Sequence, residues 1–236
     1  PSFDSNLFVN GISNRDYGAL RDSADVPLFN RTVQGQYPPG STVKPLVALA
    51  GLAEELIDPE YTVADPGWYR LPGDSRRYRD WILRIRGTGH APEVDLHMAL
   101  AESCDVYFYD LAHRMSIDTM HDRLQRFGLG RRSGIDTTAE RPGVLPSTRW
   151  KRSALGQPWF PGETLSAGIG QGYMLTTPLQ LAVATSVIAN RGAHREPRLV
   201  QWRGDQRLAA PTRDPVRRDD TNWDAGEEGM RAVVRE

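Results

Sequence analysis

Lysine is nearly absent from this sequence of 236 residues, in which Lys44 and Lys151 are the only two. Arginine supplies the rest of the 29 basic residues, and 30 acidic residues balance them to a formal net charge of −1. Charges of both signs are mixed along the chain, as in the stretch Arg76–Asp80. This pattern is typical of a solvated surface, and we expect no nucleic-acid partner.

Cysteine is equally scarce, since Cys104 is the only one, and an internal disulfide is therefore excluded. No apolar run approaches the roughly 18 residues that span a bilayer. The residues after Pro1 also lack the basic start and apolar stretch of a secretory signal. With 39% hydrophobic and 25% charged residues, the chain can bury a core, and its abrupt ends suggest a piece of a longer protein.

Apolar periodicity and turn residues predict helices separated by loops. Helices are expected from about Ser41, over 93–102, over 106–115, over 118–127, from Thr177 to about Asn190, and from about 220 onward. A strand pair is expected at Arg198–Trp202 and Gln206–Leu208, around Gly204. Proline, glycine and polar residues predict mostly loop in the segments 1–40, 58–92 and 129–170.

Ser41 and Lys44 form a Ser-x-x-Lys at the start of a predicted helix. Pro45 is tolerable only in a first helical turn, where backbone N–H groups lack partners, and this places Ser41 at the helix N-terminus. The spacing of three puts both side chains on one face of that turn. A serine nucleophile needs a nearby base, and a desolvated lysine, whose pKa falls, can serve. The helix dipole and the Ser41 N–H can stabilise an oxyanion.

Ser-x-x-Lys alone is weak evidence, because it arises by chance on the order of once per few hundred residues. The alternative is a capped helix with an exposed lysine. Two features favour catalysis: the chain otherwise uses arginine, and the neighbours of Lys44 in the sequence are apolar.

Ser103, Cys104 and Asp105 lie at a break between two predicted helices, where a short loop could present polar side chains to a cleft. Ser103 could relay a proton between a leaving amine and Lys44, and Asp105 could accept a substrate N–H or hold Lys44 in place. The alternative is that Ser103 or Asp105 caps the following helix.

The glycine-rich stretch 168–172 lacks the spacing of a nucleotide-binding loop. We expect instead a backbone that passes close to the core or the cleft, where glycine is needed. Four tryptophans could line a substrate groove or anchor the core or a partner surface: Trp68, Trp81, Trp150 and Trp159.

Several longer stretches carry a family resemblance: Phe8–Ser13, Gln36–Pro45, Tyr78–Trp81, Ala101–Tyr109, Gln157–Gly162 and Gly168–Met174. In this order they resemble the class B penicillin-binding proteins, in particular the elongation-type penicillin-binding protein 2 group. The match is specific, because runs of residues agree rather than isolated letters. The wider superfamily carries the motif set Ser-x-x-Lys, Ser-Asp-Asn and Lys-Thr-Gly.

The resemblance implies an α+β fold of the penicillin-binding protein or serine β-lactamase-like transpeptidase type. Residues 1–236 would be one partial transpeptidase domain, mainly the helical part, with much of the central antiparallel sheet missing. The implied enzyme is a serine-type peptidoglycan D,D-transpeptidase. In it, Ser41 attacks the D-Ala-D-Ala carbonyl of a stem peptide, D-alanine leaves, and an amine of a neighbouring stem takes the acyl group. β-Lactams would acylate the same serine.

The resemblance also assigns roles within the site. It makes Lys44 the general base and places Ser103 and Asp105 in the second motif, although Asp105 replaces the asparagine usual in the wider superfamily. Neither lysine is followed by Ser/Thr-Gly, so the third motif, which helps to bind the substrate carboxylate and completes the oxyanion hole, is absent from this chain. We therefore expect no catalysis by this chain in isolation. The alternatives are a serine β-lactamase or D,D-carboxypeptidase, which passes the acyl group to water, and a non-catalytic β-lactam-binding or scaffold module.

No catalytic cofactor is implied, but some elongation-type relatives carry a structural zinc ion between the first two motifs. The same ligand set, in the same order, would here be Asp65, Asp80, His90 and Cys104. A thiolate, an imidazole and two carboxylates suit tetrahedral Zn²⁺. The alternative is a buried free cysteine with scattered surface acids, and His97 is a competing ligand.

The resemblance implies partners and a location as well. The expected ligands are peptidoglycan stem peptides and β-lactams, and the expected protein partners are a wall-synthesis glycosyltransferase and elongation-complex proteins. The expected location is the periplasmic face of the bacterial inner membrane, with the anchor outside this chain.

Overall fold

Helix α3 (Lys44–Ala53) lies at the centre of the molecule and is buried on nearly all sides. Its apolar residues from Leu46 to Leu52 give it no polar face, and a helix of this kind is stable only inside a core. In this computed structural model, which describes residues 2–209, 213–216 and 220–235, four helices pack against α3: α5 (Leu96–Ala101), α6 (Asp105–Met115), α7 (Ile117–Gln125) and α11 (Asp220–Arg235).

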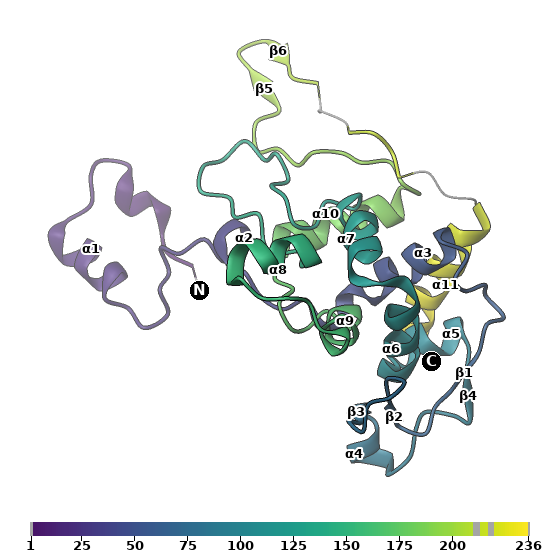
Figure 1. Ribbon diagram of the computed structural model, residues 1–236. Helices are drawn as coiled ribbons and strands as arrows, with labels where there is room; N and C mark the ends of the chain where they lie inside the picture. The colour runs from purple at the N-terminus through teal and green to yellow at the C-terminus, as the bar shows by residue number, and fades with distance from the viewer. Residues whose placement is uncertain (1, 210–212, 217–219, 236) are drawn as a thin grey trace.

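The remaining helices of the described chain are α1 (Asn14–Arg21), α2 (Arg31–Gln34), α4 (Leu83–Arg86), α8 (Thr148–Leu155), α9 (Pro161–Gly168) and α10 (Pro178–Ala189). Figure 1 shows the arrangement of the helices, with α3 next to α11 and with α1 in a lobe apart from the helical body. Single 3₁₀ turns occur at Ser5–Phe8 and Gly40–Val43.

The described strands form three short antiparallel sheets of two strands each. The pairs are β1 (Val63–Ala64) with β4 (Glu93–Val94), β2 (Trp68–Tyr69) with β3 (Tyr78–Arg79), and β5 (Trp202–Arg203) with β6 (Gln206–Arg207). The first two pairs fold the irregular segment 58–92 against α6. The mainly helical composition agrees with the prediction.

Several predicted boundaries are confirmed. The chain breaks at Ser103 between α5 and α6. Thr177 caps α10 together with Gln180, and Pro178 lies in the first turn of that helix. The strand pair around Gly204 is present, although its first strand begins at Trp202 rather than at Arg198.

The segment 129–170 is loop-rich, as predicted, but the prediction missed α8 and α9, which lie within it. Local capping starts both helices despite the many prolines and glycines nearby. The Ser147 hydroxyl accepts a hydrogen bond from the Trp150 N–H at the start of α8. At the start of α9, Pro161 occupies the first turn and Glu163 accepts the Phe160 N–H.

The segment 2–30 contains α1 but has no buried residue, and it extends away from the helical body (Figure 1). The β5–β6 hairpin also projects from this body. Among the described residues, none of the helices combines the length and the apolar character that a membrane span requires.

Candidate active site and metal centre

Ser41 lies in the 3₁₀ turn that leads directly into α3. The α-helix itself begins at Lys44 rather than at Ser41, with Pro45 in its first turn, where the missing N–H costs no hydrogen bond. Ser41 is exposed, and its carbonyl accepts the Lys44 backbone N–H. The structure therefore places the serine at the N-terminal end of the buried central helix.

The residue before Ser41 is fixed by the glycine-rich loop after α9. The Gly40 N–H donates to the Gly170 carbonyl over 2.8 Å. A Cβ atom on Gly170 would lie only 2.2 Å from the Gly40 carbonyl oxygen, and Gly170 has a φ of +70°. Both facts require glycine, and they confirm that the stretch 168–172 passes close to the core.

The Lys44 side chain is buried, with 2% of the residue exposed. Its Nζ donates to the Ser103 carbonyl at 2.7 Å, to Ser103 Oγ at 3.1 Å and to Asp105 Oδ1 at 2.7 Å. It also lies 5.3 Å from the centroid of the Phe108 ring. An ammonium has three donors, so these acceptors account for all of them. Within the described part of the chain, no hydrogen bond joins the Ser41 hydroxyl to this ammonium.

Ser103 turns the chain between α5 and α6 with a φ of +56°, a conformation uncommon outside glycine. The interpretation of Ser103 or Asp105 as a helix cap is wrong, because Cys104 occupies the N-cap of α6 and makes no side-chain cap. Instead, Asp80 Oδ2 accepts the N–H groups of Asp105, at 2.6 Å, and Val106, at 3.1 Å. This leaves the Asp105 carboxylate free to pair with Lys44. Burial raises the pKa of that carboxyl, and the Lys44 ammonium opposes the rise.

A pocket of about 390 Å³ opens beside this group and is lined by Ser41, Lys44 and Ser103. Leu100 of α5 and Met230 of α11 contribute apolar side chains to its wall. The pocket thus brings the predicted nucleophile and the predicted base together with part of the second motif, from segments far apart in the sequence.

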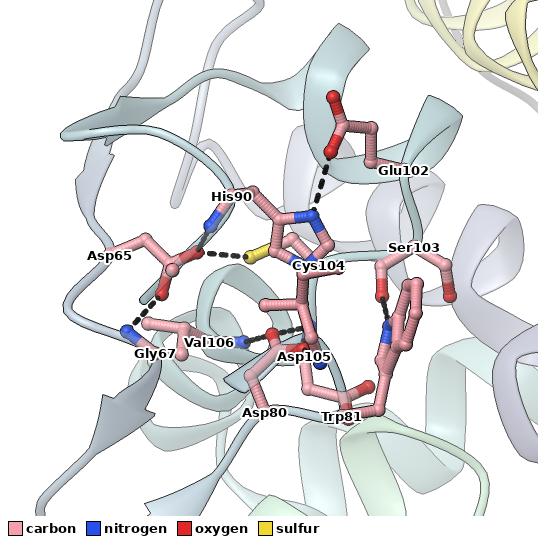
Figure 2. Close-up of polar contacts among 12 residues, drawn as sticks. Asp65, Gly67, Asp80, Trp81, His90, Glu102, Ser103, Cys104, Asp105 and Val106 are labelled. Atoms are coloured by element: carbon pink, nitrogen blue, oxygen red, sulfur yellow. Dashed lines mark hydrogen bonds and ion pairs between the residues drawn. The ribbon is translucent and has the colours of Figure 1, made fainter. Parts of the chain in front are cut away.

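Of the four tryptophans, Trp81 contacts the candidate active site, whereas Trp68, Trp150 and Trp159 are half-buried. The Trp81 Nε1–H donates to the Ser103 carbonyl over 3.1 Å, so this ring lies beside the candidate active site (Figure 2). Trp150 and Trp159 instead pack against Tyr173. The second lysine of the chain, Lys151, is buried and pairs with Glu163.

The four predicted metal ligands are brought together (Figure 2). One donor atom each of Asp65, Asp80, His90 and Cys104 lies within 4.8 Å of the others. Asp65 follows β1, Asp80 follows β3, His90 precedes β4, and Cys104 lies at the α5–α6 break. His97, the competing ligand, is exposed on α5 and does not belong to this cluster.

The contacts inside the cluster orient its donor atoms. His90 Nδ1 lies 2.9 Å from Glu102 Oε2, which leaves Nε2 directed at Asp80 Oδ1, 3.3 Å away (Figure 2). Cys104 Sγ lies 3.6 Å from Asp65 Oδ2. Burial, and then the nearby carboxylates, raise the pKa of the Cys104 thiol. Sequence reasoning missed Glu102 and Phe108, which no spacing pattern distinguishes from ordinary helix residues.

The family model for the penicillin binding protein transpeptidase domain matches residues 1–236. The peptidoglycan D,D-transpeptidase MrdA of Acinetobacter baumannii is 47% identical over 201 residues, which make up 85% of this chain and 29% of that protein. The crystal structure of Pseudomonas aeruginosa PBP2 in complex with WCK 5153 is also 47% identical, with a TM-score of 0.93, and the match covers 100% of this chain and 53% of that chain.

A third match is to PBP2 of Helicobacter pylori, solved in a complex with MreC. It is 33% identical with a TM-score of 0.84, over 97% of this chain and 40% of that chain. The chain thus spans less than a third of the MrdA relative and about half of the Pseudomonas structure. The matched structures confirm the predicted α+β fold class, of which this chain holds mainly the helical part.

Proposed function

Because the chain belongs to the penicillin-binding protein transpeptidase family, as the sequence resemblance predicted, we propose that it carries the acyl-transfer centre of a peptidoglycan D,D-transpeptidase. Residues 1–236 would form part of a single transpeptidase domain. The observation that carries the proposal is the buried Lys44 ammonium, which is held by Ser103 and Asp105 in the pocket that also exposes Ser41.

In the proposed reaction, Ser41 Oγ bonds to the carbonyl carbon of the D-Ala–D-Ala link of a stem peptide, and its proton passes to Lys44. The carbonyl π electrons move to oxygen, and the N-terminal end of the α3 segment with the Ser41 N–H stabilises that oxyanion. Collapse breaks the C–N bond and leaves the acyl group on Ser41. An amine of a second stem peptide then attacks this ester, forms the cross-link and restores the serine hydroxyl.

The reaction starts from neutral Lys44, so its ammonium must first release a proton to solvent before Lys44 can accept the proton of Ser41. Ser103 Oγ lies 3.1 Å from Nζ and is both donor and acceptor, so it suits a relay between Lys44 and the leaving amine nitrogen of D-alanine. Asp105 has a different role, because its carboxylate accepts from Nζ and keeps the amine in place. Departure of D-alanine with the relayed proton balances the first half of the reaction.

A structural Zn²⁺ held by Asp65, Asp80, His90 and Cys104 is a separate proposal. The donor set fits, since these are the atoms that tetrahedral zinc prefers and they converge within 4.8 Å. The buried carboxylates also need a counter-charge, because no lysine or arginine among the described residues pairs with Asp65 or Asp80. Glu102 would orient His90 from outside, as carboxylates commonly do for ligating histidines.

The bound ion would supply positive charge and a cross-link, with no step of acyl transfer passing through it. Its ligands would join the irregular segment 58–92 to the α5–α6 break. That break carries Ser103 and Asp105, so the ion would support the groups that hold Lys44.

The wider setting is proposed from relatives. PBP2 of Helicobacter pylori is solved with MreC, and by analogy we infer elongation-complex proteins and a wall-synthesis glycosyltransferase as partners of the whole protein. Stem peptides and β-lactams would be the ligands of the site. The inferred location is the periplasmic face of the bacterial inner membrane.

The test uses the full-length protein that carries this chain, with pentapeptide stems and an acceptor amine as substrates. Wild type should release D-alanine and form the cross-linked product, and Ser41→Ala should abolish both. Ser153→Ala, which changes an exposed serine on α8, should leave both unchanged. D-Alanine release without cross-linking would indicate a carboxypeptidase. Turnover that survives Ser41→Ala, or none in folded wild type, would sink the proposal.

A further inference from the structure

A second pocket lies near the candidate active site, with Asp105 in its lining, whereas Ser103 lines the pocket that contains Ser41. It has a volume of about 400 Å³, and Arg79, Trp81, Arg84 and Gln171 line it together with Asp105. We propose that this pocket binds a free carboxylate of the peptide substrate through Arg79 and Arg84. The inference rests on the proposed function, because it names a part of the substrate that the same site takes.

The pocket adjoins the reacting groups on two sides. The Trp81 indole donates to the Ser103 carbonyl, and the same carbonyl accepts from Lys44 Nζ at 2.7 Å. On the other side, Gln171 directly follows Gly170, whose carbonyl holds the residue before Ser41. A peptide whose scissile bond lies at Ser41 therefore has its neighbouring groups close to this pocket.

Arg79 and Arg84 differ from the other arginines of the segment 70–86. Four of these arginines have partners, with Arg70 and Arg77 stacked on Trp68, Arg76 stacked on Tyr78, and Arg86 paired with Glu102. Among the described residues, the Arg79 and Arg84 guanidinium groups have neither an acceptor nor an aromatic ring. Both are exposed, so their charge is available to a ligand.

The two carboxylates that line the pocket, those of Asp80 and Asp105, form no ion pair with Arg79 or Arg84 among the described residues. Asp80 accepts backbone N–H groups at both oxygens, and Asp105 pairs with Lys44. In the part of the chain that the structure describes, two guanidinium groups therefore line this pocket without an internal counter-ion. A guanidinium presents a planar fork of donors that matches a carboxylate, which makes an anionic peptide group the fitting occupant.

Trp81 provides an apolar surface beside these charges. The residue is 45% exposed, its N–H donates to the Ser103 carbonyl, and its ring makes a T-shaped contact with His90, so the remaining exposed part of the ring is available for contact with the peptide. An anionic end and an aromatic wall together suit a peptide that carries a carboxylate on an aliphatic side chain.

The test compares synthetic D-Ala-D-Ala peptides on the full-length protein. One peptide carries a free side-chain carboxylate, its match has that group amidated, and a third has the C-terminal carboxylate amidated. Arg79→Gln/Arg84→Gln should lower kcat/KM for the first peptide by about 10- to 100-fold, the range expected for charge-assisted hydrogen bonds. Arg77→Gln, which removes an arginine stacked on Trp68, is the matched control and should change it by less than about twofold.

The pattern across peptides identifies which carboxylate is bound. A loss restricted to peptides with the free side-chain carboxylate assigns the pocket to that group, and a loss restricted to peptides with the free C-terminus assigns it to the C-terminal carboxylate. Equal values for the double variant and wild type on all three peptides would overturn the inference.

Two further measurements separate this inference from the proposed function. A penicillin with a neutral side chain still carries its ring carboxylate, so its acylation rate should be the same in the double variant and wild type if the pocket binds the side-chain carboxylate, and lower in the double variant if it binds the C-terminal carboxylate. No acylation of wild type would count against the proposed function. Equilibrium binding of the same peptides to Ser41→Ala protein needs no turnover. In this protein, the peptide with the free carboxylate should bind more tightly than its amidated match, and the two arginine substitutions should remove that difference in Kd. No effect of the arginine substitutions on this difference would also overturn the inference.

Discussion

Lys44 Nζ lies 2.7 Å from Asp105 Oδ1, although 61 residues separate the two in the sequence. Both residues are buried, with 2% and 8% exposed. A buried ion pair gains little over apolar packing, but the loss of one partner leaves a charge stranded away from water. The pair therefore ties α3 to α6 only while both members are present.

This coupling predicts a non-additive double-mutant cycle. Asp105→Leu alone should lower the free energy of unfolding by about 3 kcal/mol, because Lys44 would keep only the Ser103 acceptors. Lys44→Met with Asp105→Leu should cost less than the sum of the two single changes. Urea denaturation measures all three variants.

The exposed pair Arg21–Asp22 is the control cycle, and its coupling should be too small to detect. Strictly additive losses for Lys44 and Asp105 would show that the pair is not an energetic unit in the folded protein.

Metal analysis tests the zinc proposal. Full-length protein purified without chelator should contain about one zinc per chain, and Cys104→Ser should reduce this below about 0.2. Removal of the metal should lower Tm and make Cys104 reactive to a thiol reagent. His97→Ala, on the exposed side of α5, should keep the metal. A wild-type protein with little zinc and a freely reactive Cys104 would refute the site.

The burial of the His194 imidazole leads us to predict that the folded protein loses stability in mild acid. The residue is 2% exposed, and neither ring nitrogen has a hydrogen-bond partner among the described residues. Burial, and then Arg213 and Arg131, lower the pKa of His194 from 6.5. The unfolded chain therefore binds a proton that the folded chain does not.

The stability that neutral His194 contributes is complete above about pH 6.5 and is lost progressively as the pH falls toward the lowered folded value. Thermal unfolding of wild type and His194→Leu across this range should give curves that diverge with pH. Parallel curves would mean that His194 has the same pKa in the folded and the unfolded protein, which would contradict this prediction.

A pair of glycine variants tests how the Ser41 turn is positioned. Gly170→Ala would bring a Cβ to 2.2 Å from the Gly40 carbonyl oxygen, whereas in Gly172→Ala the nearest atom is Ser166 Cβ at 3.3 Å. The φ angles are +70° and +71°, so the backbone strain is matched. Gly170→Ala should slow penicillin acylation by about 100-fold through displacement of Ser41, and Gly172→Ala should slow it much less. Equal effects would mean that strain alone matters.

Local signals in the sequence predicted much of the helical framework. Pro45 and Thr177 place helix starts because their constraints act within one turn. Ser147 and Pro161 are signals of the same kind, but the surrounding prolines and glycines obscured them and two helices were missed. Capping residues can therefore start a helix even in a segment whose overall composition favours loops.

The candidate site was predictable only in part. Ser41 with Lys44, and Ser103 with Asp105, are visible as short patterns, and the family resemblance joined them with the four metal ligands. Asp80 also caps α6, a role that depends on tertiary packing and has no local pattern. The sequence also gives no sign that Arg79 and Arg84 lack a partner among the described residues, because an arginine run does not reveal which of its members are paired.

The central claim is that Ser41 is the residue acylated. Full-length protein incubated with a penicillin, then digested and analysed by mass spectrometry, locates the adduct directly. We predict one adduct, on the peptide that contains Ser41, which disappears in Ser41→Ala and persists in Ser153→Ala. An adduct on any other residue, or none in folded wild-type protein, would contradict the account.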